Sequence, residues 1–330
     1  MLDIIYVNYL SEAELLHSIG TLSKLLSQVP FASRIFVVDN SFNLGSCDLS
    51  HKLHKHFELN PRTKIQYLPS DINLGFGAAC NKAARLGTYP LLYFVNCDTD
   101  FSNTDPTLFA KHVALHFSSS ASIALSGPRV LNQSGHIHSS CFTFDPISIV
   151  LKPLRHLRKI SIFSSFIPVN HFLRSRIDRI SYRGLPRHLP TFVDWLSGCS
   201  LFASRQFFDQ VGGFDPRYFL YFEDVDLCRK ARQLGMQVLF NPTLSIIHTA
   251  RHQSSSRKGV IRSLLANPSS RYHIISWLKY MWKWRRDFLT KLMLIISRFK
   301  RPVSNTPINL DTSYLLDFST HESHTTDRCA

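Results

Sequence analysis

Short apolar, β-rich runs alternate with helical patterns through the first third of the chain, and this alternation constrains the fold more than any other feature. A parallel sheet covered by helices requires this order of elements. The first helix is expected to begin at Ser11, an N-cap residue whose capping box Glu14 completes. We expect strands at Leu2–Val7, Arg34–Val38, Lys64–Leu68 and Leu91–Val95, and further helices at residues 48–58 and Gly77–Leu86.

Polar residues follow these strands at their carboxyl ends, where the ligand sites of such sheets lie. The residues at these positions are Asn8, Asp39, Asn40 and Asp98. Asp98 follows its apolar strand so closely that its carboxylate could hold Mg²⁺ or Mn²⁺ against a diphosphate. Alternatively, Asp98 and Asp100 cap the next helix, and both interpretations stay open at this point.

Three acids within four residues begin a later helix, in the run from Tyr221 to Asp226. They either compensate the positive end of the helix dipole or include a general base. Trp195 is expected either to stack on a sugar ring or to be a buried core side chain. His248 closes an apolar strand and is either structural or a nitrogen ligand of a metal.

The second half of the chain interrupts the alternation and then resumes it. Residues 146–190 mix apolar and basic residues and are interpreted as an insertion. Strands are expected at Phe192–Leu196, Ser200–Ala203, Val238–Phe240 and Ser245–His248, with a helix from Asp224 to Leu234 stopped by Gly235. We expect a catalytic domain over residues 1–255, in halves 1–145 and 191–255, then basic helices over 256–302 and a tail over 303–330.

The chain carries 38 Lys and Arg against 23 Asp and Glu, a net charge of +15. This excess favours a polyanionic partner, whether nucleic acid, an anionic membrane or a phosphorylated substrate. The positive charge lies mostly outside the motif-bearing sheet and no nucleic-acid module is recognisable, so we expect no nucleic-acid partner. A dehydrogenase is disfavoured because Gly75-Phe76-Gly77 lacks the third glycine of the dinucleotide fingerprint and follows the third strand.

Cysteine usage and hydropathy bear on location. The seven cysteines form no C-x-x-C pair and are interpreted as reduced, mostly buried thiols of a cytosolic protein. The beginning of the chain is typical of a buried strand instead of a signal peptide. No uninterrupted apolar run approaches the roughly 20 residues that span a bilayer. We therefore expect a protein of the cytoplasm or of a membrane's cytoplasmic face.

The motifs also occur in a characteristic linear series. Its segments are Val7-Asn8, Val37–Ser41, Asn73–Gly77 with Asn81, Asn96–Asp98, Val193–Gly198, Gly212–Asp215, and Tyr221–Cys228 followed by His248. In order and spacing, over roughly residues 2–255, the series resembles glycosyltransferase family 2. Within that family it is most similar to bacterial rhamnosyltransferases of O-antigen, lipopolysaccharide and cell-wall linker synthesis.

The resemblance implies a GT-A fold: a Rossmann-like, nucleotide-sugar-binding α/β domain whose mixed, mostly parallel sheet is flanked by helices. It implies an inverting transferase with Asp224 as general base and with Mg²⁺ or Mn²⁺ bound by Asp98 and His248. One departure is Asn96, which replaces the first acid of the usual D-x-D and implies a weaker affinity for the metal. The other implied contacts are Asn8, Asp39 and Asn40 with the nucleoside, Asn73, Gly75 and Asp98 with the nucleotide-sugar, and Trp195 and Glu223 with the acceptor.

The implied donor is dTDP-L-rhamnose, and the implied acceptor is N-acetylglucosaminyl-diphospho-polyprenol. A family 2 transferase that uses UDP-galactose or UDP-N-acetylglucosamine is the nearer alternative, and a basic nucleic-acid-binding protein is the remote one. The oligomeric state stays open.

A basic, amphipathic pattern fills residues 274–301, with apolar side chains at helical spacing and Lys or Arg between them. This pattern predicts helices that lie in a membrane interface, attracted to anionic lipids and anchored by Trp277, Trp282 and Trp284. The alternative is a helix packed on the domain's own core. With a lipid-linked acceptor, the membrane interpretation places the protein peripherally on the cytoplasmic face of the bacterial inner membrane.

Overall fold

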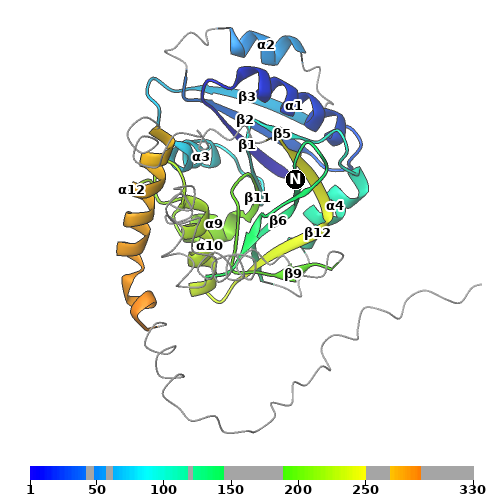
Figure 1. Cartoon of the computed structure of the whole chain (residues 1–330). Coiled ribbons are helices and arrows are strands. Elements are labelled where there is room, and N and C mark those ends of the chain that lie inside the picture. Colours follow the sequence, from blue (N-terminus) through cyan, green and yellow to red (C-terminus); the bar gives the residue numbers. More distant parts are fainter. Residues whose placement is uncertain (42–47, 57–61, 118–121, 145–188, 250–267, 291–330) are drawn as a thin grey trace, which may run out of the picture. The chain divides into compact units, whose positions relative to one another are not determined.

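The computed structural model describes residues 1–330 except 42–47, 57–61, 118–121, 145–188, 250–267 and 291–330 (Figure 1). The predicted insertion and tail therefore lie almost wholly outside the described residues. The chain divides into two compact units, Met1–Arg285 and Arg286–Ala330. All elements named below belong to the first unit; in the second, residues 286–290 are described and are helical.

A ten-stranded sheet forms the centre of the first unit, as described over these ranges (Figure 1). Its main path runs in the order β3-β2-β1-β4-β11-β6-β12-β5, and β7 pairs with β6 and β9 with β12. The strands are β1 (Leu2–Asn8), β2 (Ser33–Asp39), β3 (Thr63–Pro69), β4 (Leu91–Val95), β5 (Thr99–Asp100), β6 (Ile123–Leu131), β7 (Ile137–His138), β9 (Thr191–Phe192), β11 (Ser200–Ser204) and β12 (Gln237–His248). β8 (Cys141–Phe142) and β10 (Trp195–Leu196) form a separate antiparallel pair.

Strand directions confirm the predicted mixed, mostly parallel sheet. β3, β2, β1 and β4 are parallel to one another, whereas β11 is antiparallel to both β4 and β6. β12 is parallel to β6 and antiparallel to β5. Two predicted strands at 238–240 and 245–248 are one strand, β12, whose pairing is irregular between Asn241 and Ser245. Pro242 lies in that irregularity, because proline has no N–H to donate to a neighbouring strand.

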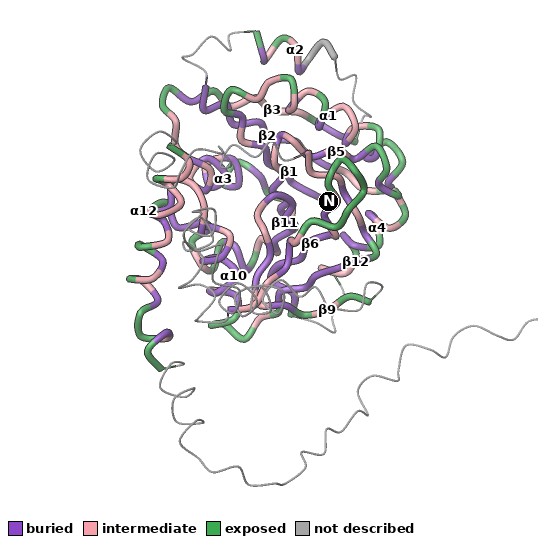
Figure 2. Tube along the Cα trace, in the orientation of Figure 1, coloured by how far each residue is buried: buried purple, intermediate pink, exposed green. Residues whose placement is uncertain are grey.

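Helices cover both faces of the sheet. They are α1 (Glu12–Leu26), α2 (Leu49–His56), α3 (Phe76–Ala84), α4 (Pro106–Leu115), α9 (Arg205–Gln210), α10 (Glu223–Gln233) and α12 (Pro268–Lys283). Tyr93 and Phe94 are successive residues of β4 and so point to opposite faces. Tyr93 contacts Phe109 of α4, while Phe94 contacts Phe208 of α9. The sheet is thus buried between two helical layers, and β1 and β11 are coloured almost entirely as buried in Figure 2.

Two local expectations differ from the structure. Ser11 occupies the N-cap position of α1, but its side chain makes no capping bond, because the hydroxyl donates to the carbonyl oxygen of Tyr9 at 3.2 Å. The predicted strand 192–196 is divided between β9 and β10, which pair with different partners. By contrast, α10 ends as predicted, with Gly235 in the left-handed conformation at φ 71°.

Five of the seven cysteines lie among the described residues. Cys80, Cys97, Cys141, Cys199 and Cys228 are all free and buried. Within the described ranges, every helix is too short or too polar to cross a bilayer.

α12 presents two different faces. Ser276 and Tyr280 are buried, whereas Ile275, Leu278 and Trp282 are 46%, 54% and 70% exposed. The prediction of Trp284 as a membrane anchor is wrong: its side chain is 7% exposed because its indole N–H donates to a buried carboxylate within the first unit.

Candidate active site

The carboxylate of Asp39 ties together the carboxyl ends of three neighbouring strands. Its Oδ1 accepts from Asn8 Nδ2 at 3.0 Å and from Ser41 Oγ at 2.7 Å, and its Oδ2 accepts from Tyr67 Oη at 2.8 Å. Asn8 and Asp39 are both fully buried. Two of the three residues predicted to border the nucleoside, Asn8 and Asp39, therefore lie together, and both form hydrogen bonds with the Ser41 hydroxyl.

The loop after β3 is joined to the loop after β2. Asn40 Nδ2 donates to the carbonyl oxygen of Gly75 at 3.1 Å, and the Gly75 N–H donates to Asn73 Oδ1 at 2.9 Å. Asn73 and Gly75, predicted to approach the nucleotide-sugar, thus form one connected group at the amino end of α3 with Asn40, predicted to border the nucleoside. The amino end of a helix suits an anionic group, although the first N–H of α3, that of Phe76, already donates to the carbonyl oxygen of Phe219.

Gly75 has no room for a side chain. Its φ is +78°, and a Cβ atom there would lie 2.3 Å from the carbonyl oxygen of Phe219. That same oxygen accepts from the Phe76 N–H at 2.9 Å. The glycine is therefore required both by its left-handed backbone and by a close approach of the segment that precedes α10.

Asp98 and His248 come together at the ends of β4 and β12. His248 Nε2 lies 3.0 Å from Asp98 Oδ1 and 3.3 Å from Asn96 Nδ2. Thr249 fastens the pair, since its N–H and its hydroxyl both donate to the carbonyl oxygen of Asp98, at 2.9 and 3.0 Å. Burial opposes ionisation of Asp98, but the hydrogen bond from His248 and its charge together hold the Asp98 pKa below its usual value.

These two side chains fit a divalent cation. His248 Nδ1 is buried without a hydrogen-bond partner among the described residues. A bound cation would take the place of the proton between His248 Nε2 and Asp98 Oδ1, so that the nitrogen lone pair and a carboxylate oxygen would both face it. One nitrogen and one oxygen leave most coordination positions of Mg²⁺ or Mn²⁺ for water and phosphate oxygens. In the described part of the chain, no three His, Cys, Asp or Glu side chains gather as a larger cluster.

Asp224 is connected to the same region by the loop that begins β11. Its Oδ2 accepts from the Gly198 N–H at 2.8 Å, while the carbonyl oxygen of the next residue, Cys199, accepts from the Asn96 N–H at 3.0 Å. Burial, with smaller contributions from the negative charges of Asp98 and Asp224, raises the pKa of the Cys199 thiol to about 12. Both carboxylates therefore lie near the Gly198-Cys199 pair.

The two residues predicted to touch an acceptor are mostly buried. Trp195 is 7% exposed; its ring stacks on Phe142 with centroids 4.1 Å apart, and its indole N–H donates to the carbonyl oxygen of Thr143. Glu223 is 6% exposed. Trp195 lies close in sequence to Gly198, and Glu223 precedes Asp224, so both flank the segment that holds the predicted base.

Left-handed backbone occurs beside two of the candidate site segments, those of Asn8 and Asp224. Among the described non-glycine residues, positive φ is found at Leu10, Tyr221 and Phe222, with values of 53°, 69° and 70°. Leu10 follows Asn8, and the other two directly precede Glu223 and Asp224. Because a left-handed non-glycine residue costs roughly 1–2 kcal/mol, such strain is retained only where the surroundings impose it, commonly at functional sites.

Sequence reasoning missed several residues that build this arrangement. Tyr67 holds Asp39 from β3, but an aromatic residue in a strand is too common to be a signal. The backbone N–H of Gly198 carries no side-chain signal at all. Ser41 lies in the Val37–Ser41 segment of the motif series. Its position two residues after Asp39 is the one sequence signal for its hydrogen bond to that carboxylate.

Comparison with known proteins gives partial matches. No family model matches the chain. It is 44% identical over 62 residues to N-acetylglucosaminyl-diphospho-decaprenol L-rhamnosyltransferase of Mycobacterium tuberculosis, which covers 19% of this chain and 20% of that protein. It is 26% identical over 149 residues to rhamnosyltransferase WbbL of Escherichia coli, which covers 44% of this chain and 53% of that protein. The chain is a relative of rhamnosyltransferases.

This relationship spans only part of each protein. The matches cover about a fifth of the mycobacterial rhamnosyltransferase and about half of the Escherichia coli one. A longer and more distant match is the low-salt glycan biosynthesis hexosyltransferase Agl10 of Haloferax volcanii, 23% identical over 253 residues, 75% of this chain and 66% of that protein. Among solved structures, GalNAc-T7 with UDP, GalNAc and Mn²⁺ aligns with a TM-score of 0.49 at 16% identity, over 87% of this chain and 54% of that one.

Proposed function

We propose that the chain is an inverting glycosyltransferase that moves a sugar from a nucleoside diphosphate to a lipid-linked acceptor. One observation carries the proposal: Asp98 and His248 meet at the carboxyl end of the sheet, and the Gly198-Cys199 pair joins Asp224 to the same end. This places a pair suited to a metal and a candidate base around one short segment. The rhamnosyltransferase relatives support the same reaction class.

In this proposal Asp224 removes the proton from an acceptor hydroxyl as that oxygen attacks the anomeric carbon of the sugar. The new carbon–oxygen bond forms opposite the bond to the diphosphate, which breaks and leaves its electron pair on the departing nucleoside diphosphate. The configuration at the anomeric carbon is therefore inverted. The Gly198 N–H bonds one oxygen of Asp224 and orients the carboxylate.

Asp98 and His248 would hold Mg²⁺ or Mn²⁺. When bound, such a cation supplies positive charge that offsets the charge developing on the leaving diphosphate. Asn96 stands where an acid is usual, so the two side chains bring one negative charge to the site. The amino end of α3, beside Asn73 and Gly75, offers N–H groups to the same nucleotide-sugar, while Asn40 secures that loop and Asp39 with Asn8 borders the nucleoside.

We further propose L-rhamnose, carried by dTDP, as the sugar and N-acetylglucosaminyl-diphospho-polyprenol as the acceptor. The name of the mycobacterial relative supports both the sugar and the type of acceptor. Trp195 and Glu223, beside the segment that holds Asp224, are the proposed acceptor contacts. The match to a hexosyltransferase over 75% of the chain favours a UDP-hexose as the second candidate donor.

We also propose that α12 places the protein on an anionic membrane surface, the cytoplasmic face of a bacterial inner membrane. Ile275, Leu278 and Trp282 recur at helical spacing on its exposed face. Exposed basic residues flank them at Arg271, Lys279 and Arg285. An apolar stripe bordered by positive charge suits the interface of an anionic bilayer.

The test is a panel of nucleotide-sugars incubated with the full chain, Mn²⁺ and a polyprenyl-diphospho-N-acetylglucosamine acceptor. We expect a glycosylated lipid only with dTDP-L-rhamnose, and NMR of the product should show the anomeric configuration opposite to that of the donor. Product with a UDP-hexose alone would replace the proposed donor with the second candidate. Absence of product and of ligand-induced thermal shift with every donor would overturn the proposal.

A further inference from the structure

α12 contacts the segment that leads into α10. The buried hydroxyl of Ser276 donates to the carbonyl oxygen of Leu220 at 2.8 Å, across 56 positions of sequence. The ring of Tyr272 stacks on Phe219 with centroids 4.5 Å apart. A backbone carbonyl and a ring of this segment are thus held by side chains of a helix that comes much later in the chain.

The left-handed residue Phe222 is enclosed by α12. Its ring is 2% exposed and lies 5.3 Å from the ring of Tyr280 and 5.4 Å from the ring of His273. Tyr221 contacts the same His273 ring at 5.2 Å. Two consecutive left-handed non-glycine residues need surrounding contacts to persist, and a large part of those contacts comes from α12.

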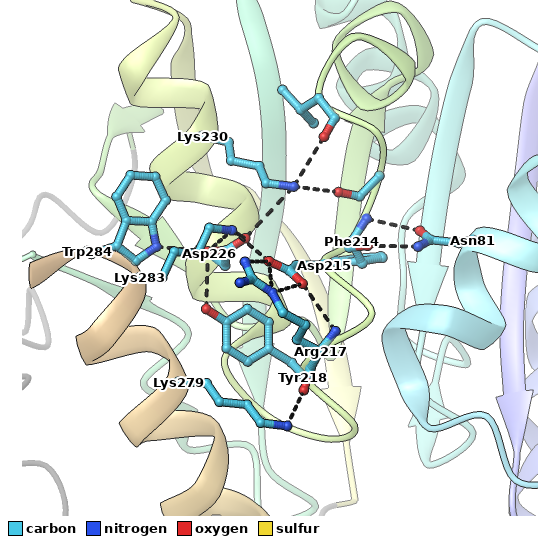
Figure 3. A network of polar contacts seen from close by, with 12 residues as sticks. Asn81, Phe214, Asp215, Arg217, Tyr218, Asp226, Lys230, Lys279, Lys283 and Trp284 are labelled. Atoms are coloured by element: carbon cyan, nitrogen blue, oxygen red, sulfur yellow. Dashed lines mark hydrogen bonds and ion pairs between the residues drawn. The ribbon is translucent and has the colours of Figure 1, made fainter.

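The first turn of α10 is also bound to α12, through Asp226 (Figure 3). This carboxylate is fully buried and lies 2.7 Å from Lys283 Nζ, and it accepts from Trp284 Nε1 at 2.8 Å. Asp226 follows Asp224 by two residues in the same helical turn. Because a buried carboxylate is costly without its partners, the ion pair holds this turn in one position relative to α12.

α12 also contacts residues that precede the Tyr221-Phe222 turn. Lys283 Nζ also lies 2.8 Å from Asp215 Oδ2, and Lys279 Nζ donates to the carbonyl oxygen of Arg217 at 2.7 Å (Figure 3). The side of α12 that faces the protein therefore meets the chain before, within and after the left-handed turn. A helix that only covered an apolar core would not need this series of polar contacts.

We propose that α12 is a positioning element for the base: Ser276 and Lys283 hold the Tyr221-Phe222 turn and the first turn of α10, and so set where the carboxylate of Asp224 lies. The inference rests on the proposed glycosyl transfer for its kinetic consequences. Ser276 and Lys283 act through Asp224 and not on substrate. Displacing the carboxylate by about 1 Å would cost up to about 10²-fold in rate.

The kinetic test uses the full chain with Ser276→Ala and Lys283→Met. We expect kcat at saturating substrates to fall by up to about 10²-fold, and Lys283→Arg, which keeps the charge, to recover most of it. Ser27→Ala is a matched control, because its hydroxyl also donates to a carbonyl oxygen at 2.8 Å, at the exposed end of α1. Lys111→Met, at an exposed position of α4, controls for loss of a lysine. Unchanged kcat in Ser276→Ala and Lys283→Met would overturn the inference.

A double-mutant cycle separates positioning from general support of the fold. If Ser276 and Lys283 act through the base, neither substitution should lower the residual rate of Asp224→Asn further, because the group that they position is already absent. A further loss of the same factor in the Asp224→Asn background would mean that the residues act elsewhere, and would overturn the inference.

Hydrogen exchange distinguishes failure of this inference from failure of the proposed function. A wild-type chain without transferase activity would defeat the function alone. In the same samples, Ser276→Ala should exchange the amides of residues 220–226 faster than Ser27→Ala does, with the amides of β1 and β4 unchanged. Equal exchange over residues 220–226 in the two variants would overturn the positioning role whether or not the chain is active.

Discussion

His248 Nε2 lies 3.0 Å from Asp98 Oδ1, although the two residues are far apart in the sequence. The contact exists because β12 crosses the sheet to lie between β6 and β5, and β5 directly follows Asp98. His248 itself pairs with Thr99 of β5. The contact between Asp98 and His248 therefore depends on the pairing of β12 with β5 at this edge of the sheet.

Replacing Asp98 or His248 by Ala should weaken Mn²⁺ binding in the presence of a nucleoside diphosphate. Loss of an outer-shell partner of a metal already costs about 10–100-fold in affinity or activity, so loss of a direct ligand should cost at least as much. Titration calorimetry measures the affinity, and chelation of the wild type should abolish transfer until Mn²⁺ is restored. His51→Ala, at an exposed position of α2, is the control. Wild-type Mn²⁺ affinity in both variants would remove them as ligands.

Asp224→Asn should retain the fold and lose activity. Each Asp224 oxygen accepts one backbone N–H, Oδ2 from Gly198 and Oδ1 from Val225, both at 2.8 Å. Asn keeps one of these bonds through its amide oxygen, whereas its side chain can no longer take a proton. Since general-base catalysis contributes about 10²–10⁴-fold, kcat should fall by that factor with little change in the melting temperature. Asp209→Asn, an exposed position on α9, should be unaffected. Near-normal turnover by Asp224→Asn would assign the base elsewhere.

Stability should fall as the pH decreases from about 6.5 to 4, because the buried His112 and the partly buried His116 are held in the neutral form. Burial lowers the pKa of His112 to about 3 and that of His116 to about 4. Their Nε2 atoms share the Ser126 hydroxyl, at 2.9 and 2.6 Å. Across this window the unfolded chain binds protons that the folded chain does not, so stability increases with pH. The loss is at most on the order of 3 kcal/mol for each histidine.

Urea unfolding at several pH values measures this dependence. Replacing both histidines by Leu should flatten the slope between pH 6.5 and 4, whatever the absolute stability of that variant. His51→Ala should leave the slope unchanged. Paired carboxylates such as Asp215 contribute at lower pH, since Asp in unfolded chains titrates near about 3.9. A double Leu variant that keeps the full slope would contradict the assignment.

Gly75→Ala should destabilise the protein more than Gly135→Ala. Both glycines have positive φ, +78° and +74°, so both substitutions place Ala in a backbone conformation that favours glycine. At Gly75 the ψ of −178° lies in a region essentially restricted to glycine, and the new Cβ would also lie 2.3 Å from the carbonyl oxygen of Phe219, whereas nothing lies within 4 Å at Gly135. The difference between the two free energies of unfolding combines these two costs, and equal values would contradict both.

Replacing Ile275, Leu278 and Trp282 by Ser should release the chain from anionic vesicles in a flotation assay, and the wild type should not bind zwitterionic vesicles. Raised salt should weaken wild-type binding, since each basic residue near the surface contributes about 1 kcal/mol. A matched triple Ser variant at exposed apolar positions elsewhere should still bind; these are Leu86, Phe117 and Ile137. Persistent binding of the α12 variant would exclude this face as the docking surface.

Much of the sheet could be predicted because β-rich apolar runs and polar strand ends follow from local sequence. The neighbourhood of Asn8 and Asp39 follows from the same logic, since parallel strands end at one edge. The proximity of Asp98 and His248 was expected only through the resemblance, because strand order is not encoded in any local pattern.

The packing of α12 against the rest of the first unit could not be predicted from the sequence. Its amphipathic pattern predicts one apolar face, and Trp284 was assigned to a membrane. The face that packs on the protein instead uses Ser276, Tyr280 and Lys283; Ser276 bonds a carbonyl oxygen, and Lys283 bonds the carboxylate of Asp226. A lysine that looks solvent-exposed in sequence can be partly buried when a distant acid neutralises it, and no single-chain pattern records that pairing.

The contact between Phe219 and Phe76 is made by main-chain atoms alone, an N–H and a carbonyl oxygen. Every residue supplies the carbonyl oxygen and every residue except proline supplies the N–H, so this hydrogen bond itself depends on neither side chain. What the junction cannot tolerate is bulk one residue earlier, at position 75. The glycine at position 75, where any side chain would meet Phe219, is therefore the sequence feature that marks this contact between two distant loops.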